Sequence, residues 1–230
     1  MAEKNSENEN EIERSKASIE LIQLSKKETI ILRCWNETLK QFKPKCIVFD
    51  LDFTLWPFLI DSQILPPLKT TKSFENDEFK VKVHDHDNKL VNHYEDTTLI
   101  IKMLKDRCFA DKSFHLAIAS RATVHNLAME LFEIFGWSGY FDSIQIYSGN
   151  KIKHLKQIKN ELKLKSFNEI LFFDDNKSNL ESTETLGVVG HQVRRHYGLN
   201  VAELVKGLEK FNLLQRVSTN PTQTTKAKKP

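Results

Sequence analysis

The sequence predicts an α/β fold in which a Rossmann-like parallel sheet forms the middle of three layers, with helices on both of its faces. Two observations carry this prediction. Short apolar runs without polar alternation occur at residues 46–49, 116–119 and 170–173, and such runs are typical of strands buried on both faces of a parallel sheet. Helical patterns separate the runs, and this alternation favours right-handed crossovers between parallel strands.

Weaker patterns complete the alternation. Residues 143–147 and 188–193 are the weaker candidate strands. Residues 56–92 interrupt the order, and their prolines and the turn at 85–88 predict a loop and a minimal β-hairpin flap instead of a large cap domain. Asn200 is a suitable N-cap for the last helix. Apolar side chains at helical spacing predict helices at 94–105, 123–135, 152–162, 179–186 and 201–211.

Composition divides the 230 residues into four parts. Residues 1–14 are polar and almost free of apolar side chains, so we expect them to be disordered. Residues 15–43 carry apolar side chains at helical spacing and predict a helical extension that packs on the main domain or on a partner. The α/β domain spans residues 44–214, and the Lys- and Thr-rich residues 215–230 form a second disordered tail.

Charge and cysteine usage exclude several classes of protein. A net charge of +3 is too small to indicate a nucleic-acid partner. Three separated cysteines without a CxxC pair form neither a zinc motif nor a disulfide framework, and they favour a reducing compartment. No apolar run approaches the roughly 18 residues of a membrane span, and the N-terminus lacks the apolar core of a secretory signal. We therefore expect a cytoplasmic monomer without a membrane or nucleic-acid partner.

Polar residues follow the predicted strands at the point where each one ends. Ligands of an open parallel sheet bind outside the carboxyl ends of its strands, so these side chains predict one pocket. The fourth strand leads into Gly149 and a helix start that carries a lysine. The candidate residues are Asp50, Asp52, Thr54, Ser120, Arg121, Lys151, Asp174 and Asp175.

This combination suits phosphoryl transfer. Carboxylates alone would repel a phosphate dianion, but Mg²⁺ bound by oxygen ligands removes that repulsion, and Lys151 adds a positive charge beside the reacting group. An ionised Asp50 can attack phosphorus and form an aspartyl-phosphate. Asp52 can protonate the leaving oxygen and later activate a water molecule.

The motifs also resemble a known superfamily. A DxDxT segment at residues 50–54, a serine after the next strand, a lysine at a helix start and a later Asp pair resemble the haloacid dehalogenase superfamily. Within it, residues 45–211 are similar to the magnesium-dependent phosphatase-1 family, an acid phosphatase type, in segments 49–58, 119–121, 146–151 and 172–176.

Two segments depart from that family. Ser148 stands where the family usually has proline, which predicts a less rigid loop. Residues 194–198 read Arg-Arg-His-Tyr-Gly where the family tends to read Arg-Asp-Gly, which could alter the substrate preference at that rim.

The resemblance implies a nearly capless haloacid dehalogenase-like domain that uses Mg²⁺. It makes Asp50 the nucleophile and a metal ligand, and Asp52 the acid and base with its backbone carbonyl on the metal. Asp175 is the expected third protein ligand, with Asp174 as the less favoured choice. The resemblance places Ser120, Arg121 and Thr54 in the substrate-binding set, and Lys151 beside the nucleophile.

The expected substrates are phosphotyrosine-like groups on proteins, or sugar phosphates including the phosphates of fructosamines. One alternative is a catalytically idle binding protein of the same fold that docks a partner through its N-terminal helix. Another is an enzyme that transfers phosphate to a different acceptor or dehalogenates. Asp52 favours phosphoester chemistry over dehalogenation, because an alkoxide leaving group needs a proton and a halide does not.

Overall fold

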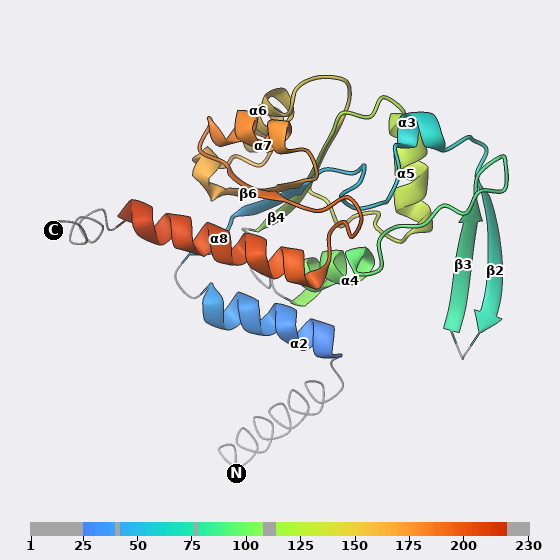
Figure 1. The fold of residues 1–230 in the computed structure, drawn as a ribbon, viewed down its shortest axis with the longest axis horizontal. Coiled ribbons are helices and arrows are strands. Elements are labelled where there is room, and N and C mark those ends of the chain that lie inside the picture. Colours follow the sequence, from blue (N-terminus) through green and yellow to red (C-terminus); the bar gives the residue numbers. More distant parts are fainter. Residues whose placement is uncertain (1–24, 40–41, 76–77, 108–113, 220–230) are drawn as a thin grey trace, which may run out of the picture.

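The structure of the protein is a computed structural model, and it describes residues 25–39, 42–75, 78–107 and 114–219. The predicted tail at 1–14, the first part of the predicted helical extension and residues 220–230 lie outside the described residues. Figure 1 shows the sheet at the centre with helices on both sides of it.

Five parallel strands form the central sheet, in the order β5-β4-β1-β6-β7. The sequence prediction of a parallel α/β sheet is confirmed, and β1 matches the predicted residues at both ends. β1 lies in the middle, with β4 and β6 as its direct neighbours. The strands are β1 Cys46–Phe49, β4 His115–Ser120, β5 Ser143–Ile146, β6 Ile170–Asp174 and β7 Val189–Gln192.

Alternate residues of β1, β4 and β6 contribute to two separate hydrophobic clusters, because successive side chains of a strand point to opposite faces. Phe49 belongs to the cluster that the helices α4, α5 and α8 cover, and it stacks on Phe173 with ring centroids 5.5 Å apart. Val48 belongs to the cluster under α6 and α7. The helices are α4 Thr97–Lys102, α5 His125–Ile134, α6 Lys151–Glu161, α7 Lys177–Glu184 and α8 Val201–Thr219.

The described part of the N-terminal extension packs on the α/β domain. Helix α2 (Lys26–Arg33) starts with a capping box and continues into the π-helical turn η1 (Cys34–Thr38). Ile31 is fully buried in the main core, and α2 lies along α8 (Figure 1). Lys27 donates to Asp96 at 2.6 Å, and the other oxygen of Asp96 accepts from the backbone N–H of Val201. Asp96 thus links α2 to the first residue of α8.

The insertion after β1 contains the short helix α3 (Ile60–Gln63) and an antiparallel hairpin of β2 (Lys69–Glu75) and β3 (Glu78–His84). The hairpin projects from the body of the molecule beside α3 and α5 (Figure 1). A turn does form at 85–88, since Asp85 accepts from backbone N–H groups. It joins the end of β3 to Leu90, which forms an antiparallel bridge with His84. The longer hairpin pairs β3 with β2, whose polar sequence lacks the apolar alternation that predicts a strand.

Helix α8 continues to Thr219, so the predicted start of a disordered tail at 215 is wrong. Leu213, Leu214 and Val217 are exposed in these last turns. The spacing of buried apolar residues, on which the sequence prediction depended, therefore does not extend to the end of the helix. The predicted N-cap is confirmed, because Asn200 Oδ1 accepts from Glu203 N–H. Two short turns complete the elements: η2 (Met103–Arg107) and η3 (Phe167–Glu169).

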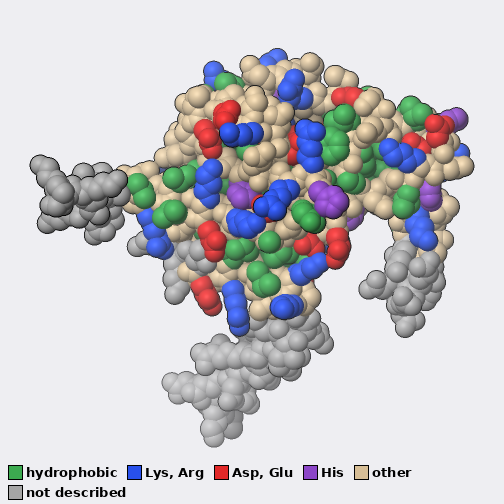
Figure 2. Space-filling model, viewed as in Figure 1, with side chains coloured by type: hydrophobic (Ala, Val, Ile, Leu, Met, Phe, Trp, Pro, Cys, Tyr) green, Lys and Arg blue, Asp and Glu red, His purple; other side chains and the backbone are tan. Residues whose placement is uncertain are grey.

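Positive and negative side chains are interspersed over the face drawn in Figure 2. Among the described residues, no helix combines the length with the apolar character that a membrane crossing requires.

Candidate active site

The carboxyl ends of β1, β4 and β6 meet at one edge of the sheet and place Asp50, Ser120 and Asp174 beside one another. The backbone N–H of Asp50 donates to the carbonyl oxygen of Phe173 at 2.9 Å, so sheet pairing continues into the site. A cleft of about 270 Å³ opens at this edge. It is lined by Asp50, Asp52, Phe53, Leu59, Asp61, Ser120, Arg121, Ala122, Ser148, Asp175, Asn176, Asn179 and Arg195.

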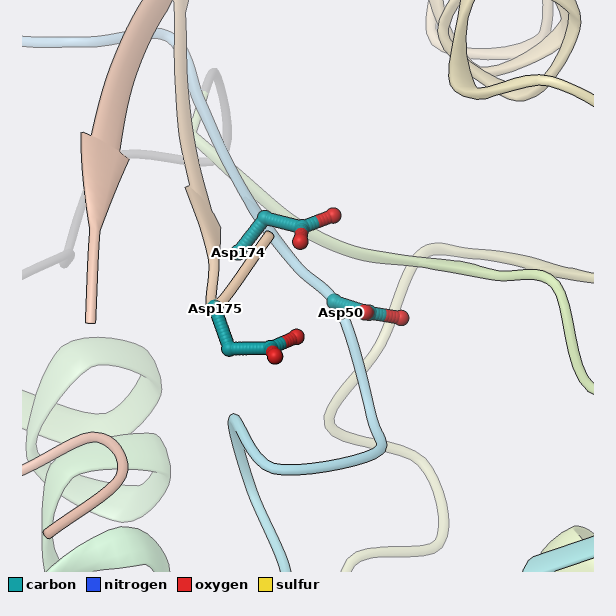
Figure 3. A group of neighbouring side chains, drawn as sticks. All are labelled: Asp50, Asp174 and Asp175. Carbon is teal, nitrogen blue, oxygen red and sulfur yellow. The ribbon is translucent and has the colours of Figure 1, made fainter. Parts of the chain in front are cut away.

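Three buried carboxyl groups converge at the cleft. One oxygen of each of Asp50, Asp174 and Asp175 lies within 4.8 Å of the others, and Figure 3 shows their carboxylates turned toward the same space. Burial, with the like charge of Asp50, raises the pKa of Asp174 to about 7. Burial also raises the pKa of Asp175. Crowded carboxylates in a water-poor place fit a hard divalent cation, because its charge offsets theirs.

Lys151 lies directly behind these carboxylates. Its Nζ is 2.6 Å from Asp50 Oδ1 and 3.3 Å from Asp174 Oδ2, and it also donates to the carbonyl oxygen of Ala119. The residue is only 1% exposed. An ammonium group at such a depth requires anionic partners, and Asp50 and Asp174 supply them.

The segment before Lys151 fixes the position of the lysine. Gly149 has a φ of 152°, in the region that favours glycine, and Asn150 caps α6 by accepting from the backbone N–H of Lys153. The fully buried ring of His154 contacts the carbonyl oxygens of Asn150 (Nδ1, 2.8 Å) and Tyr147 (Nε2, 2.9 Å). Through these contacts His154 holds the loop that the replacement of proline by Ser148 was expected to loosen.

Asp52 faces the cleft with one oxygen engaged. Its Oδ1 accepts from Trp56 Nε1–H at 2.7 Å and from the backbone N–H of Ile60 at 3.2 Å. Oδ2 has no hydrogen-bond partner in the part of the chain that the structure describes. Burial raises the pKa of Asp52 to about 6. One oxygen is therefore oriented by donors, while the other can exchange a proton.

Phe53 and Thr54 form the turn that follows Asp52. Phe53 has a φ of 55°, an uncommon backbone conformation for a non-glycine residue. Thr54 was predicted to bind substrate, but it is fully buried and does not line the cleft. Its carbonyl oxygen accepts from Leu199 N–H at 2.8 Å, and its hydroxyl makes no hydrogen bond to the described residues. Thr54 therefore stabilises the turn after Asp52 and does not face the cleft.

Ser120 and Arg121 lie on the opposite wall of the cleft from β6. Ser120 is 1% exposed, and its hydroxyl accepts from Ala122 N–H at 3.2 Å, which orients the oxygen. Arg121 is exposed and lines the cleft. Ser120 is the last residue of β4 and Arg121 directly follows it, at the strand end where the sequence predicted both.

The adjacent acids of the Asp pair have different surroundings. Asp174 accepts from Asn176 N–H and from Asn179 Nδ2, in addition to Lys151. Asp175 Oδ2 accepts from Arg195 Nε at 2.6 Å. Both acids belong to the carboxylate group, and the preference for Asp175 over Asp174 as a metal ligand stays a prediction.

Three side chains of the cleft had no assigned role in the sequence analysis. Asn179 orients Asp174, and Arg195 pairs with Asp175. Asp61 accepts from the backbone N–H groups of Thr123 and Val124 and so fixes the start of α5 beside the cleft. The departure of residues 194–198 from the family pattern was the one feature of the sequence that pointed to Arg195.

Comparison with known proteins gives concordant matches. The chain matches the Acid Phosphatase family over residues 42–213. It is 31% identical over 187 residues to magnesium-dependent phosphatase 1 of Homo sapiens, which covers 81% of this chain and 96% of the human protein. It is 30% identical over 172 residues to a HAD-like hydrolase superfamily protein of Schizosaccharomyces pombe, covering 71% of this chain and 93% of that protein.

A weaker similarity links the chain to a solved structure. The N-terminal part of a Bacteroides fragilis protein, which contains a phosphatase domain complexed with Mg, gives a TM-score of 0.48 at 17% identity. The match covers 76% of this chain and 42% of that one.

Proposed function

The chain belongs to the Acid Phosphatase family of magnesium-dependent, haloacid dehalogenase-type phosphatases, and we propose that it hydrolyses phosphomonoesters through an aspartyl-phosphate on Asp50. The observation that carries this proposal is the ion pair of 2.6 Å between Lys151 Nζ, buried behind the carboxylates, and Oδ1 of the cleft residue Asp50. A carboxylate that is oriented by an ion pair with a buried ammonium group is suited to act as a nucleophile.

In the first step an oxygen of Asp50 attacks phosphorus while the bond from phosphorus to the leaving oxygen breaks. Asp50 Oδ2 has no protein partner among the described residues, so it is the atom available for attack. Ser120 supplies an oriented hydroxyl for a phosphoryl oxygen, and Lys151 offsets the charge that develops. Arg121 extends the positive charge along the cleft wall.

Asp52 then serves both steps. It donates its proton to the leaving oxygen, which departs as an alcohol. In the second step it takes a proton from the water that attacks the phosphorus on Asp50; the bond between Asp50 and phosphorus breaks, inorganic phosphate leaves, and the Asp50 carboxylate is regenerated. Its raised pKa, to about 6, allows a protonated fraction near neutral pH, and Trp56 and Ile60 hold it in place.

Asp50, Asp174, Asp175 and the carbonyl of Asp52 are the groups that would hold Mg²⁺. When bound, the cation neutralises the carboxylates and the phosphoryl oxygens, which removes the repulsion between enzyme and substrate. The proximity of the three carboxylate oxygens supports this assignment.

The proposed substrates are phosphotyrosine-like groups on proteins, and sugar phosphates including fructosamine phosphates. The short insertion between β1 and α4 supports either class, because it carries a hairpin and one short helix instead of a cap domain. The intact set of Asp50, Asp52 and Lys151 speaks against an idle binding protein. A cytoplasmic monomer that binds no nucleic acid or membrane stays a prediction of the sequence.

A panel of phosphotyrosine, sugar phosphates and fructosamine phosphates tests the substrate assignment, with Mg²⁺ and then with EDTA. Asp50→Asn should abolish turnover of every substrate while retaining the fold. Asp87→Asn, a matched change at an exposed aspartate outside the cleft, should leave turnover unchanged. Turnover by Asp50→Asn at the wild-type rate would contradict the role of Asp50.

A further inference from the structure

Arg195 is held at the rim of the catalytic cleft by two contacts. Its Nε donates to Asp175 Oδ2 at 2.6 Å, and its guanidinium carbon lies 4.8 Å from the centroid of the Phe53 ring. Phe53 and Asp175 both line the cleft, as Arg195 itself does. The guanidinium is therefore fixed on one edge and on one face.

The remaining donors of this guanidinium are available. Neither terminal Nη atom makes a hydrogen bond or an ion pair within the described part of the chain. The side chain is 62% exposed, so the terminal edge can meet a ligand without first leaving a buried position. A planar pair of N–H donors matches the two oxygens of a carboxylate or a second phosphate.

From this arrangement we propose that Arg195 binds a second anionic group on the substrate, so that the preferred substrates are phosphomonoesters whose alcohol part carries a carboxylate or a comparable oxyanion. The inference rests on the proposed function, because it assumes that the phosphate to be hydrolysed sits at Asp50. It narrows the substrate class by adding a charge requirement at a defined rim residue.

Arg195 is better suited to this role than Arg121, the other arginine of the cleft. Arg121 is exposed, and the structure gives its side chain no fixed partner among the described residues. Arg195 is already restrained by Asp175 and Phe53, so less side-chain entropy is lost when it binds an anion.

A role limited to orienting Asp175 would leave the donor pair unexplained. The Nε–H alone makes the contact to Asp175, and that contact would steady a metal ligand whatever the substrate carries. The two roles therefore differ in one measurable property, which is the dependence of the effect on the charge of the leaving group.

The test compares matched substrates in the presence of Mg²⁺. The ortho, meta and para isomers of carboxyphenyl phosphate carry an anion at three distances from phosphorus, and the corresponding carbamoylphenyl phosphates are neutral partners of similar shape. Wild-type protein is expected to prefer at least one carboxylate over its amide in kcat/KM. Arg195→Gln should reduce that preference by roughly 10- to 100-fold, the value of a hydrogen bond to a charged group.

The matched control is Arg194→Gln, which removes the same charge from an exposed neighbour that does not line the cleft and should retain the preference. Arg195→Lys keeps the positive charge but lacks the planar pair of N–H donors, and it should retain only part of the preference for the carboxylate substrate. The inference is overturned if no carboxylate isomer is preferred, or if Arg195→Gln lowers kcat/KM equally for both partners and only shifts the Mg²⁺ requirement. Failure to hydrolyse even the neutral partners would instead count against the proposed function.

Discussion

Lys151 Nζ lies 2.6 Å from Asp50 Oδ1 and is buried with it at the edge of the sheet. The same nitrogen is 3.3 Å from Asp174 Oδ2. The ammonium group of Lys151 thus connects Asp50, after the end of β1, to Asp174, at the end of β6. The Lys151 ammonium stabilises two buried carboxylates, and the other oxygen of Asp50, Oδ2, is the atom proposed to attack phosphorus.

Lys151→Met should lower kcat/KM for 4-nitrophenyl phosphate by about 100- to 1,000-fold, because it removes a charge-stabilising donor from the reacting centre. It should also lower the stability of the metal-free protein by about 3–5 kcal/mol, since two buried carboxylates lose their cation. Lys156→Met, on an exposed position of the same helix, is the control for both measurements. Unchanged kcat/KM in Lys151→Met would refute the assigned role.

Asp52→Asn should affect substrates in proportion to their need for a proton. An alkyl phosphate has a strongly basic leaving oxygen, so kcat/KM should fall by about 100- to 10,000-fold. A 4-nitrophenolate leaves without protonation, and its kcat/KM should fall far less. An equal loss for both substrates would show that Asp52 does not act as the general acid.

The extent to which sequence predicted this site depends on the kind of contact. β1 and β6 were predictable because both strands are buried on both faces and thus continuously apolar, and the acids at their ends followed from the parallel topology. The hairpin partner β2 was missed because a projecting strand does not need apolar residues. The pair of Arg195 and Asp175 depends on how the loop after β7 returns to β6, and no local pattern encodes that path.

Mg²⁺ should raise the melting temperature of the wild-type protein. A concentration of 100 times Kd stabilises the folded state by about 2.7 kcal/mol, which corresponds to several degrees for a domain of this size. Asp174→Asn and Asp175→Asn should each reduce this shift, because each removes an oxygen anion from the group around Asp50. Glu133→Gln, at an exposed residue of α5, should show the wild-type shift. A full shift in both aspartate variants would place the ion elsewhere.

His93 should make the folded state sensitive to acid. Burial beside Phe135 and Trp137 lowers its pKa. The neutral ring fits its contacts, with Nδ1 donating to Tyr94 O and Nε2 accepting from the Thr98 hydroxyl. Because the folded pKa lies below the ordinary value of 6.5, the unfolded chain takes up the proton first, and stability falls as the pH drops from about 6.5 through the folded pKa.

Chemical denaturation at a series of pH values from about 8 to about 5 measures how the free energy of unfolding changes as His93 titrates. His93→Gln cannot titrate and should show a shallower loss of unfolding free energy with falling pH than the wild type. His125→Gln, at an exposed position, should follow the wild-type curve. Parallel curves for wild type and His93→Gln would rule out the linkage.

The identity of the nucleophile is tested most directly by trapping the phosphorylated protein. Protein quenched during turnover of 4-nitrophenyl phosphate with Mg²⁺ is reduced with borohydride, which converts an aspartyl-phosphate into homoserine, and the modified position is located by peptide mass spectrometry. The account predicts modification at Asp50, dependent on substrate and absent from Asp50→Asn. Modification at another aspartate, or turnover without any at Asp50, would contradict it.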